Sequence, residues 1–181
     1  MITQADFWNL IALSLKGNLG DKAAQCQKLQ EQLLALSPED IVQFQHRFDG
    51  YLIQAYTWDL WAVATLIGRG CSDNCFIDFR SWLISKGKDV YEAAMKEPDS
   101  LAQSITEKDG DCQFELFQYV AIEAWAKKAG RSADDFPYGG NIARKAPAGQ
   151  EWRYDARFQQ RFPQLCARFE SNFLQLSRTL H

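Results

Sequence analysis

Hydrophobic residues recur along this chain at spacings of three and four, which is the period of an amphipathic α-helix. Breaks rich in Gly, Pro, Ser and Asp separate these segments, and no run alternates between apolar and polar residues for more than a few positions. The pattern therefore predicts an all-α protein, a single compact multi-helix bundle of about eight to nine helices.

Capping residues place the expected helix ends. The clearest start is Ser37-Pro38-Glu39-Asp40, since Ser can cap free amides, Pro suits the first helical position, and acids meet the positive end of the helix dipole. The other helices are expected over Asp6–Lys16, from Asp21, over Thr57–Gly68, from Ser72 or Asp73 to Lys86, over Asp89–Met95, in a short stretch at Pro98–Ser100, and over Cys112–Lys128.

The end of the chain has a different pattern. Residues 131–154 contain several Pro and Gly residues and are expected to be mostly loop. Residues 155–181, with a break near Pro163, are expected to form a C-terminal helical tail docked on the bundle. We find no second core, so residues 1–181 are interpreted as one helical domain.

Composition narrows the class of protein. The chain has 181 residues, of which 46% are hydrophobic and 24% charged, with a net charge of −3, so a soluble globular protein is expected rather than a disordered one. The longest apolar run, Leu60–Ala64, is far shorter than the roughly 18 residues a membrane span needs, so no membrane association is expected. Five scattered cysteines and the absence of a leader pattern favour a cytoplasmic location.

Asp59 stands out because it lies in the most apolar helix of the sequence. A buried carboxylate is costly unless it finds a donor, reaches solvent or stays protonated. Arg47 and Arg80, just off the apolar stripes of neighbouring helices, are the expected partners, because the guanidinium fork can bind a carboxylate through two hydrogen bonds. A structural ion pair or a helix cap is favoured here over a functional carboxylate.

The densest polar cluster runs from Cys71 to Arg80. Cys75, in a first helical turn, could form a reactive pair with Cys71. We favour the alternative, in which Cys71 is a small buried apolar residue, Cys75 is incidental, and Ser72 and Asp73 cap the helix, because no histidine base is near in sequence.

Carboxylates could also form a metal site. Asp73 and Asp78, with Asp59 or Asp49, could hold a hard cation such as magnesium, which needs no histidine. The spacing matches no established ligand motif, so a solvated or Arg-paired acidic rim is favoured, and neither a metal nor a cofactor is expected. We interpret His46 as a surface or interface residue, although Arg47 and Asp49 nearby leave a role as general base open.

The C-terminal tail interleaves basic and aromatic residues that could contact nucleic acid: Arg144, Lys145, Arg153, Arg157, Arg161 and Arg168 with Trp152, Tyr154, Phe158 and Phe162. The same aromatic spacing fits a helix that docks on the bundle with its arginines outside. Docking is favoured, and we do not expect a nucleic-acid partner.

Ordered motifs along the chain resemble a known family. They are Phe7-Trp8, Leu36–Glu39, Arg47–Asp49, Tyr56–Trp61, Gly70–Asp73, Phe79–Ile84, Pro98–Leu101, Arg161–Pro163 and Ala167–Phe169. This set is similar to the bacterial domain-of-unknown-function family 4240, over nearly the whole chain. The resemblance implies a bacterial, single-domain, cytoplasmic protein and brings no established reaction. The matching polar positions are Arg47, Asp49, Asp59, Cys71, Ser72, Asp73, Arg80 and Asp99, whereas Asn74-Cys75 departs from the expected acidic residue and glycine, and Cys166 stands where a Trp is usual.

Two function classes follow. The favoured hypothesis is a non-catalytic binding or regulatory module whose surface around Arg47, Trp61, Asp73 and Arg80 receives a protein or small polar ligand. The alternative is a hydrolase or transferase that activates water through Asp49, Asp59, Asp73 and Asp78, with or without a divalent metal.

Overall fold

The computed structural model describes residues 1–139 and 146–179, and within these residues the protein is all α-helical, as predicted. Its first eight α-helices are α1 (Gln4–Leu15), α2 (Lys22–Leu34), α3 (Pro38–Gln54), α4 (Trp58–Gly68), α5 (Asp73–Ser85), α6 (Lys88–Lys96), α7 (Leu101–Ser104) and α8 (Val120–Ala129). Three further helices follow the long irregular segment: α9 (Ala156–Arg161), α10 (Pro163–Arg168) and α11 (Glu170–Thr179). None of the described helices has the length and apolar composition that crossing a bilayer requires.

The predicted helix starts are confirmed by capping hydrogen bonds. The side chains of Ser37, Thr57 and Ser72 accept bonds from backbone N–H groups at the starts of α3, α4 and α5, as expected for N-caps. Asp155 does the same for α9.

The helix expected over Cys112–Lys128 is wrong in its first half. Cys112 has a positive φ of 57°, which a right-handed helix does not allow, and the backbone N–H of Phe114 donates to the carbonyl of Asp78 on α5. A short 3₁₀ turn, Glu115–Gln118, comes after Phe114, so α8 begins only at Val120. A tertiary hydrogen bond to α5 therefore overrides the local helical pattern.

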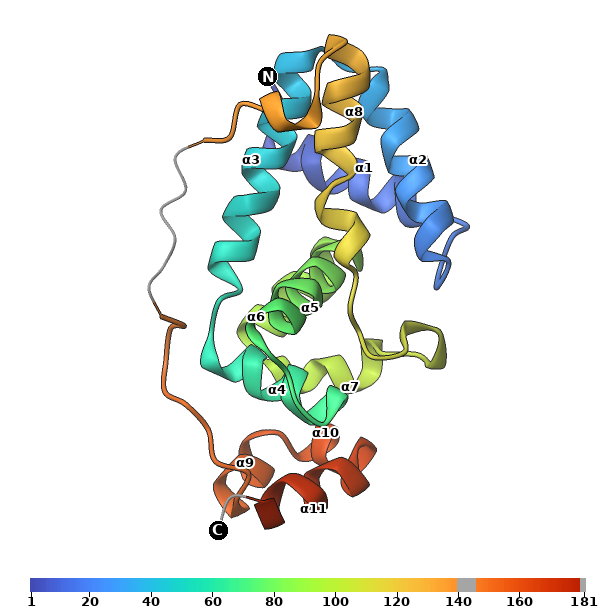
Figure 1. Ribbon diagram of the computed structural model, residues 1–181. Helices are drawn as coiled ribbons and strands as arrows, with labels where there is room; N and C mark the ends of the chain where they lie inside the picture. The colour runs from blue at the N-terminus through green and yellow to red at the C-terminus, as the bar shows by residue number, and fades with distance from the viewer. Residues whose placement is uncertain (140–145, 180–181) are drawn as a thin grey trace.

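The helices form two groups along the long direction of the molecule (Figure 1). Helices α1, α2, α3 and α8 pack together at one end, and α9, α10 and α11 lie at the other end, next to α4. Helix α5 lies between these ends. One continuous cluster of buried apolar side chains links both groups, with large members such as Phe7, Phe44, Trp82 and Phe158.

The C-terminal segment, defined here as residues 146–179, is attached by buried polar contacts. Asp99 is 4% exposed, and its carboxylate accepts from the backbone N–H groups of Gln164 (3.1 Å) and Leu165 (2.9 Å) at the start of α10. Asn172 of α11 is 6% exposed and donates to the carbonyls of Leu66 and Ile67 at the end of α4. These contacts hold the segment against α4 and α7.

Candidate functional site

Asp59 has a different partner from those that the sequence suggested. Its Oδ1 accepts a hydrogen bond from the indole N–H of Trp152 at 2.7 Å, and its Oδ2 lies 3.8 Å from the guanidinium of Arg161. The predicted pairing with Arg47 or Arg80 is therefore wrong. The face of α4 that carries Asp59 points toward the C-terminal segment, whose residues supply both partners.

The two arginines expected at Asp59 bind backbone carbonyls instead. Arg47 Nε donates to the carbonyl of Ile2 at 2.9 Å, and Arg80 donates from Nη1 to the carbonyl of Leu52 at 2.6 Å. The Arg80 guanidinium lies 4.8 Å from the ring centroids of Tyr56 and Phe76, and burial lowers its pKa to about 10. Both arginines serve the fold at these positions.

The acidic residues proposed as a metal site do not converge. Asp49 accepts from the amide of Gln45 (2.9 Å) and Asp78 from the amide of Gln118 (2.8 Å), while Asp73 is exposed at the start of α5. Desolvation raises the pKa of the Asp49 and Asp78 carboxyls. Within residues 1–139 and 146–179 no group of three or more His, Cys, Asp or Glu residues could hold a metal ion. The alternative of a carboxylate metal cluster therefore finds no support in this part of the chain.

His46 contacts the loop after α8. Its Nε2 accepts from the backbone N–H of Gly139 at 2.9 Å and lies 3.3 Å from the carbonyl of Pro137. Both contacts are to backbone groups of this loop, so His46 anchors the loop to α3.

The cysteines at the start of α5 form a pair. Cys71 and Cys75 are joined by a disulfide, with Cα atoms 5.3 Å apart, within the range that a disulfide bridges. The interpretation of Cys75 as incidental is therefore wrong. Burial raises the thiol pKa of the other three cysteines to about 12 for Cys26 and Cys112 and to about 11 for Cys166, which makes them poor nucleophiles.

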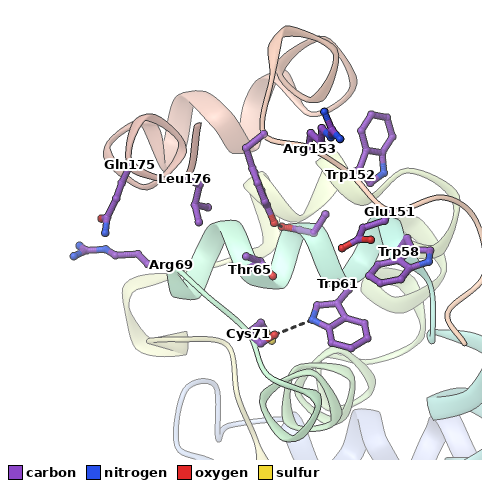
Figure 2. Close-up of a pocket in the computed structure, with 12 residues that line it drawn as sticks. Trp58, Trp61, Thr65, Arg69, Cys71, Glu151, Trp152, Arg153, Gln175 and Leu176 are labelled. Atoms are coloured by element: carbon purple, nitrogen blue, oxygen red, sulfur yellow. Dashed lines mark hydrogen bonds between the residues drawn. The ribbon is translucent and has the colours of Figure 1, made fainter. Parts of the chain in front are cut away.

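A cavity lies between α4 and the C-terminal segment. It has a volume of about 690 Å³, within the size range of small-molecule sites. One wall comes from successive turns of α4 and the residue that follows it, namely Trp58, Trp61, Ala62, Thr65 and Arg69. The other comes from Glu151–Tyr154 and from Gln175 and Leu176 of α11, with Cys71 at the base (Figure 2). We call this cavity the α4 pocket.

The aromatic wall of the α4 pocket is held in place by its neighbours. The ring of Trp61 stacks between Trp58 (5.3 Å) and Phe76 (4.8 Å), measured between ring centroids, and its indole N–H donates to the Cys71 carbonyl at 2.9 Å (Figure 2). Trp152 is fixed by its bond to Asp59. The Tyr154 hydroxyl donates to the Ala62 carbonyl at 3.0 Å. The wall is therefore preformed.

Of the eight predicted site residues, the structure brings only Trp61 and Cys71 to the α4 pocket, and Asp59 borders it through Trp152. Arg47, Asp49, Ser72, Asp73 and Arg80 lie outside its lining. Sequence analysis missed Trp58, Arg69 and Leu176. The spacing of Trp58, Trp61, Thr65 and Arg69 on one face of α4 could have indicated a second, mixed face of that helix.

Three of the four tail aromatics, all except Trp152, pack inside the protein. Phe158 and Phe162 are fully buried, and Tyr154 is 8% exposed, as the docking interpretation predicted. These rings are not available to stack on bases. Arg144 and Lys145, the other basic candidates, lie outside the described residues.

The helices and the α4 pocket define an all-α domain. The model of the family described as "Protein of unknown function (DUF4240)" matches residues 2–127, and this chain belongs to that family. No curated protein and no solved structure shows a significant match to the chain. The match covers α4 but ends before the C-terminal segment, so the α4 pocket combines residues from inside and outside the matched region.

Proposed function

We propose that this protein is a binding module and that the α4 pocket is its ligand site. The observation that carries the proposal is the preformed wall of Trp58, Trp61 and Trp152, which borders a cavity large enough for a small molecule. The rings are fixed by stacking and by hydrogen bonds to Asp59 and Cys71, so a ligand would not have to order them.

A catalytic role receives less support from the same residues. Acyl or phosphoryl transfer needs a nucleophile or a base within hydrogen-bond reach of a reacting atom. The pocket-lining residues of the described chain carry three indole rings, two guanidinium groups, the hydroxyls of Thr65 and Tyr154, and one carboxylate, that of Glu151. The Tyr154 hydroxyl donates to the Ala62 carbonyl, and the sulfur of Cys71 is joined to Cys75. Binding is the function that these groups favour.

The proposal can be tested with 2-naphthalenemethanol, a neutral aromatic probe, followed by NMR of the six indole N–H groups. We expect saturable shifts at Trp58, Trp61 and Trp152 and none at Trp8, Trp82 and Trp125, which do not line the pocket. Equal shifts at all six, or none at the first three, would contradict a site at this place.

A matched pair of variants on α11 separates the effect of filling the pocket from the effect of adding a Trp to this helix. Leu176 lines the pocket, whereas Leu174, on the same helix, is 45% exposed and does not. We expect Leu176→Trp to abolish probe binding and Leu174→Trp to leave it unchanged. If both variants bind the probe as the parent does, the α4 pocket is not the site.

A further inference from the structure

The charged groups of the α4 pocket are placed unequally along its length. Arg69 and Gln175 lie at one end, and Trp58 and Glu151 lie at the other, with Trp61 between them (Figure 2). A second lining cation, Arg153, lies beside Trp152 (Figure 2), so a ligand in this pocket would meet Arg69 at one end and aromatic rings with Arg153 at the other.

Arg69 is held in position by a buried side chain. Its Nε donates to Oδ1 of Asn172 at 2.8 Å, and the Asn172 amide is itself fixed by the carbonyls of Leu66 and Ile67. This leaves the two terminal nitrogens of the guanidinium, which are one of the pairs that can bind a carboxylate through two hydrogen bonds. Among the residues that the structure describes, no carboxylate forms an ion pair with Arg69 or with Arg153.

The backbone at Arg69 has a conformation that is uncommon for a residue with a Cβ. Arg69 ends α4 with φ 60° and ψ 24°, the left-handed conformation in which glycine or asparagine is favoured at a helix C-terminus. A residue with a Cβ is disfavoured in this conformation, and Gly70 follows directly. An arginine at this position has a conformational cost that glycine would not have.

From these observations we infer that the α4 pocket takes a small organic acid, a molecule with an aromatic or other flat apolar group and one carboxylate or comparable anionic group. The inference rests on the proposed function. The flat group would lie against Trp58 and Trp152, and the acid group would bind the terminal nitrogens of Arg69. Glu151 favours this orientation, because its carboxylate opposes the charge of Arg153 at the Trp58 end, whereas no lining carboxylate lies beside Arg69.

Three probes with the same ring and different charge test this ligand class: 2-naphthoate, 2-naphthalenemethanol and 2-naphthylmethylammonium, each titrated by calorimetry. We expect 2-naphthoate to bind about tenfold more tightly than the alcohol, with the ammonium compound weakest. If no probe binds, the proposed function fails. If the alcohol binds and the acid has no advantage, only the ligand class fails.

Two variants with the same change in net charge test whether Arg69 is the residue that binds the carboxylate of 2-naphthoate. Arg69→Gln should weaken binding of 2-naphthoate about tenfold more than it weakens binding of the neutral probe, because it removes one charge-assisted contact. Arg131→Gln, a change at an exposed arginine outside the pocket, removes the same net charge and should leave both affinities unchanged. An equal loss of 2-naphthoate affinity in the two variants would overturn the assignment of Arg69.

Discussion

Trp152 donates its indole N–H to the Asp59 carboxylate at 2.7 Å, and this bond joins the irregular segment before α9 to the first turn of α4. The carboxylate that appeared most costly to bury is thereby the attachment point for one wall of the α4 pocket. Asp59 also lies 3.8 Å from Arg161, which pairs in turn with Glu97 after α6. Three separate parts of the chain meet at this side chain.

Removing the Asp59 carboxylate should therefore loosen the C-terminal segment. We expect Asp59→Ala to lower the free energy of unfolding by about 2 kcal/mol, the range for a hydrogen bond to a charged group, as measured by urea denaturation. The control is Asp73→Ala, at an exposed carboxylate, which should cost only about 0.5 kcal/mol. Equal losses would show that the Trp152 bond contributes nothing.

Asp99 acts as an N-cap supplied from a distant part of the chain. Because it accepts from the N–H groups of Gln164 and Leu165, we expect Asp99→Ala to destabilise the protein by about 2 kcal/mol, the upper range for losing a cap. Asp99→Asn keeps an acceptor oxygen and should recover much of this loss. Limited proteolysis should show earlier cleavage around α10 in the Ala variant than in the Asn variant.

Asp109 should make the protein sensitive to acid. Its 4% exposed carboxylate is desolvated, which alone would raise its pKa, but hydrogen bonds from Lys86, Trp82 and Thr106 outweigh this and lower the pKa below the usual value. A carboxyl whose pKa is lower in the folded state stabilises the fold fully above its unfolded pKa of about 3.9 and loses this contribution as the pH falls through the folded value.

The variant Asp109→Asn tests this contribution. It leaves the Lys86 ammonium, which is 10% exposed, without its carboxylate, so we expect a loss of about 3 kcal/mol at pH 7. Chemical denaturation at pH 7 and at pH 2 should show that the difference from the parent shrinks at the lower pH. A constant difference would mean that the carboxylate is not the group that titrates.

Chemical labelling should distinguish the disulfide-bonded cysteines from the buried free cysteines. After oxidation, mass spectrometry of peptides should find Cys71 linked to Cys75, and these two thiols should react with iodoacetamide in the folded protein only after reduction. Cys112 and Cys166 are buried and should react only on unfolding, because a buried thiol with a raised pKa is largely protonated at neutral pH. A linkage between any other pair would contradict this assignment.

Helix positions could be predicted from the sequence because their causes are local. Ser37, Thr57 and Ser72 each contact backbone groups within three residues, so spacing and residue type were sufficient. The pairing of Asp59 with Trp152 could not be predicted in this way, since hydrophobic period shows which face of a helix is covered but not which segment covers it. The same applies to Cys112–Tyr119, where a bond from Phe114 to Asp78 replaces helical structure.

The two walls of the α4 pocket come from stretches of sequence that can change separately. Residues 2–127 carry the family match and supply the rings of Trp58 and Trp61, whereas Glu151–Tyr154 and Leu176 lie beyond it. Substitutions in the later stretch can thus reshape one side of the opening while the helix opposite keeps its surface. If a ligand occupies the α4 pocket as proposed, a change in the tail alone would alter which molecules fit.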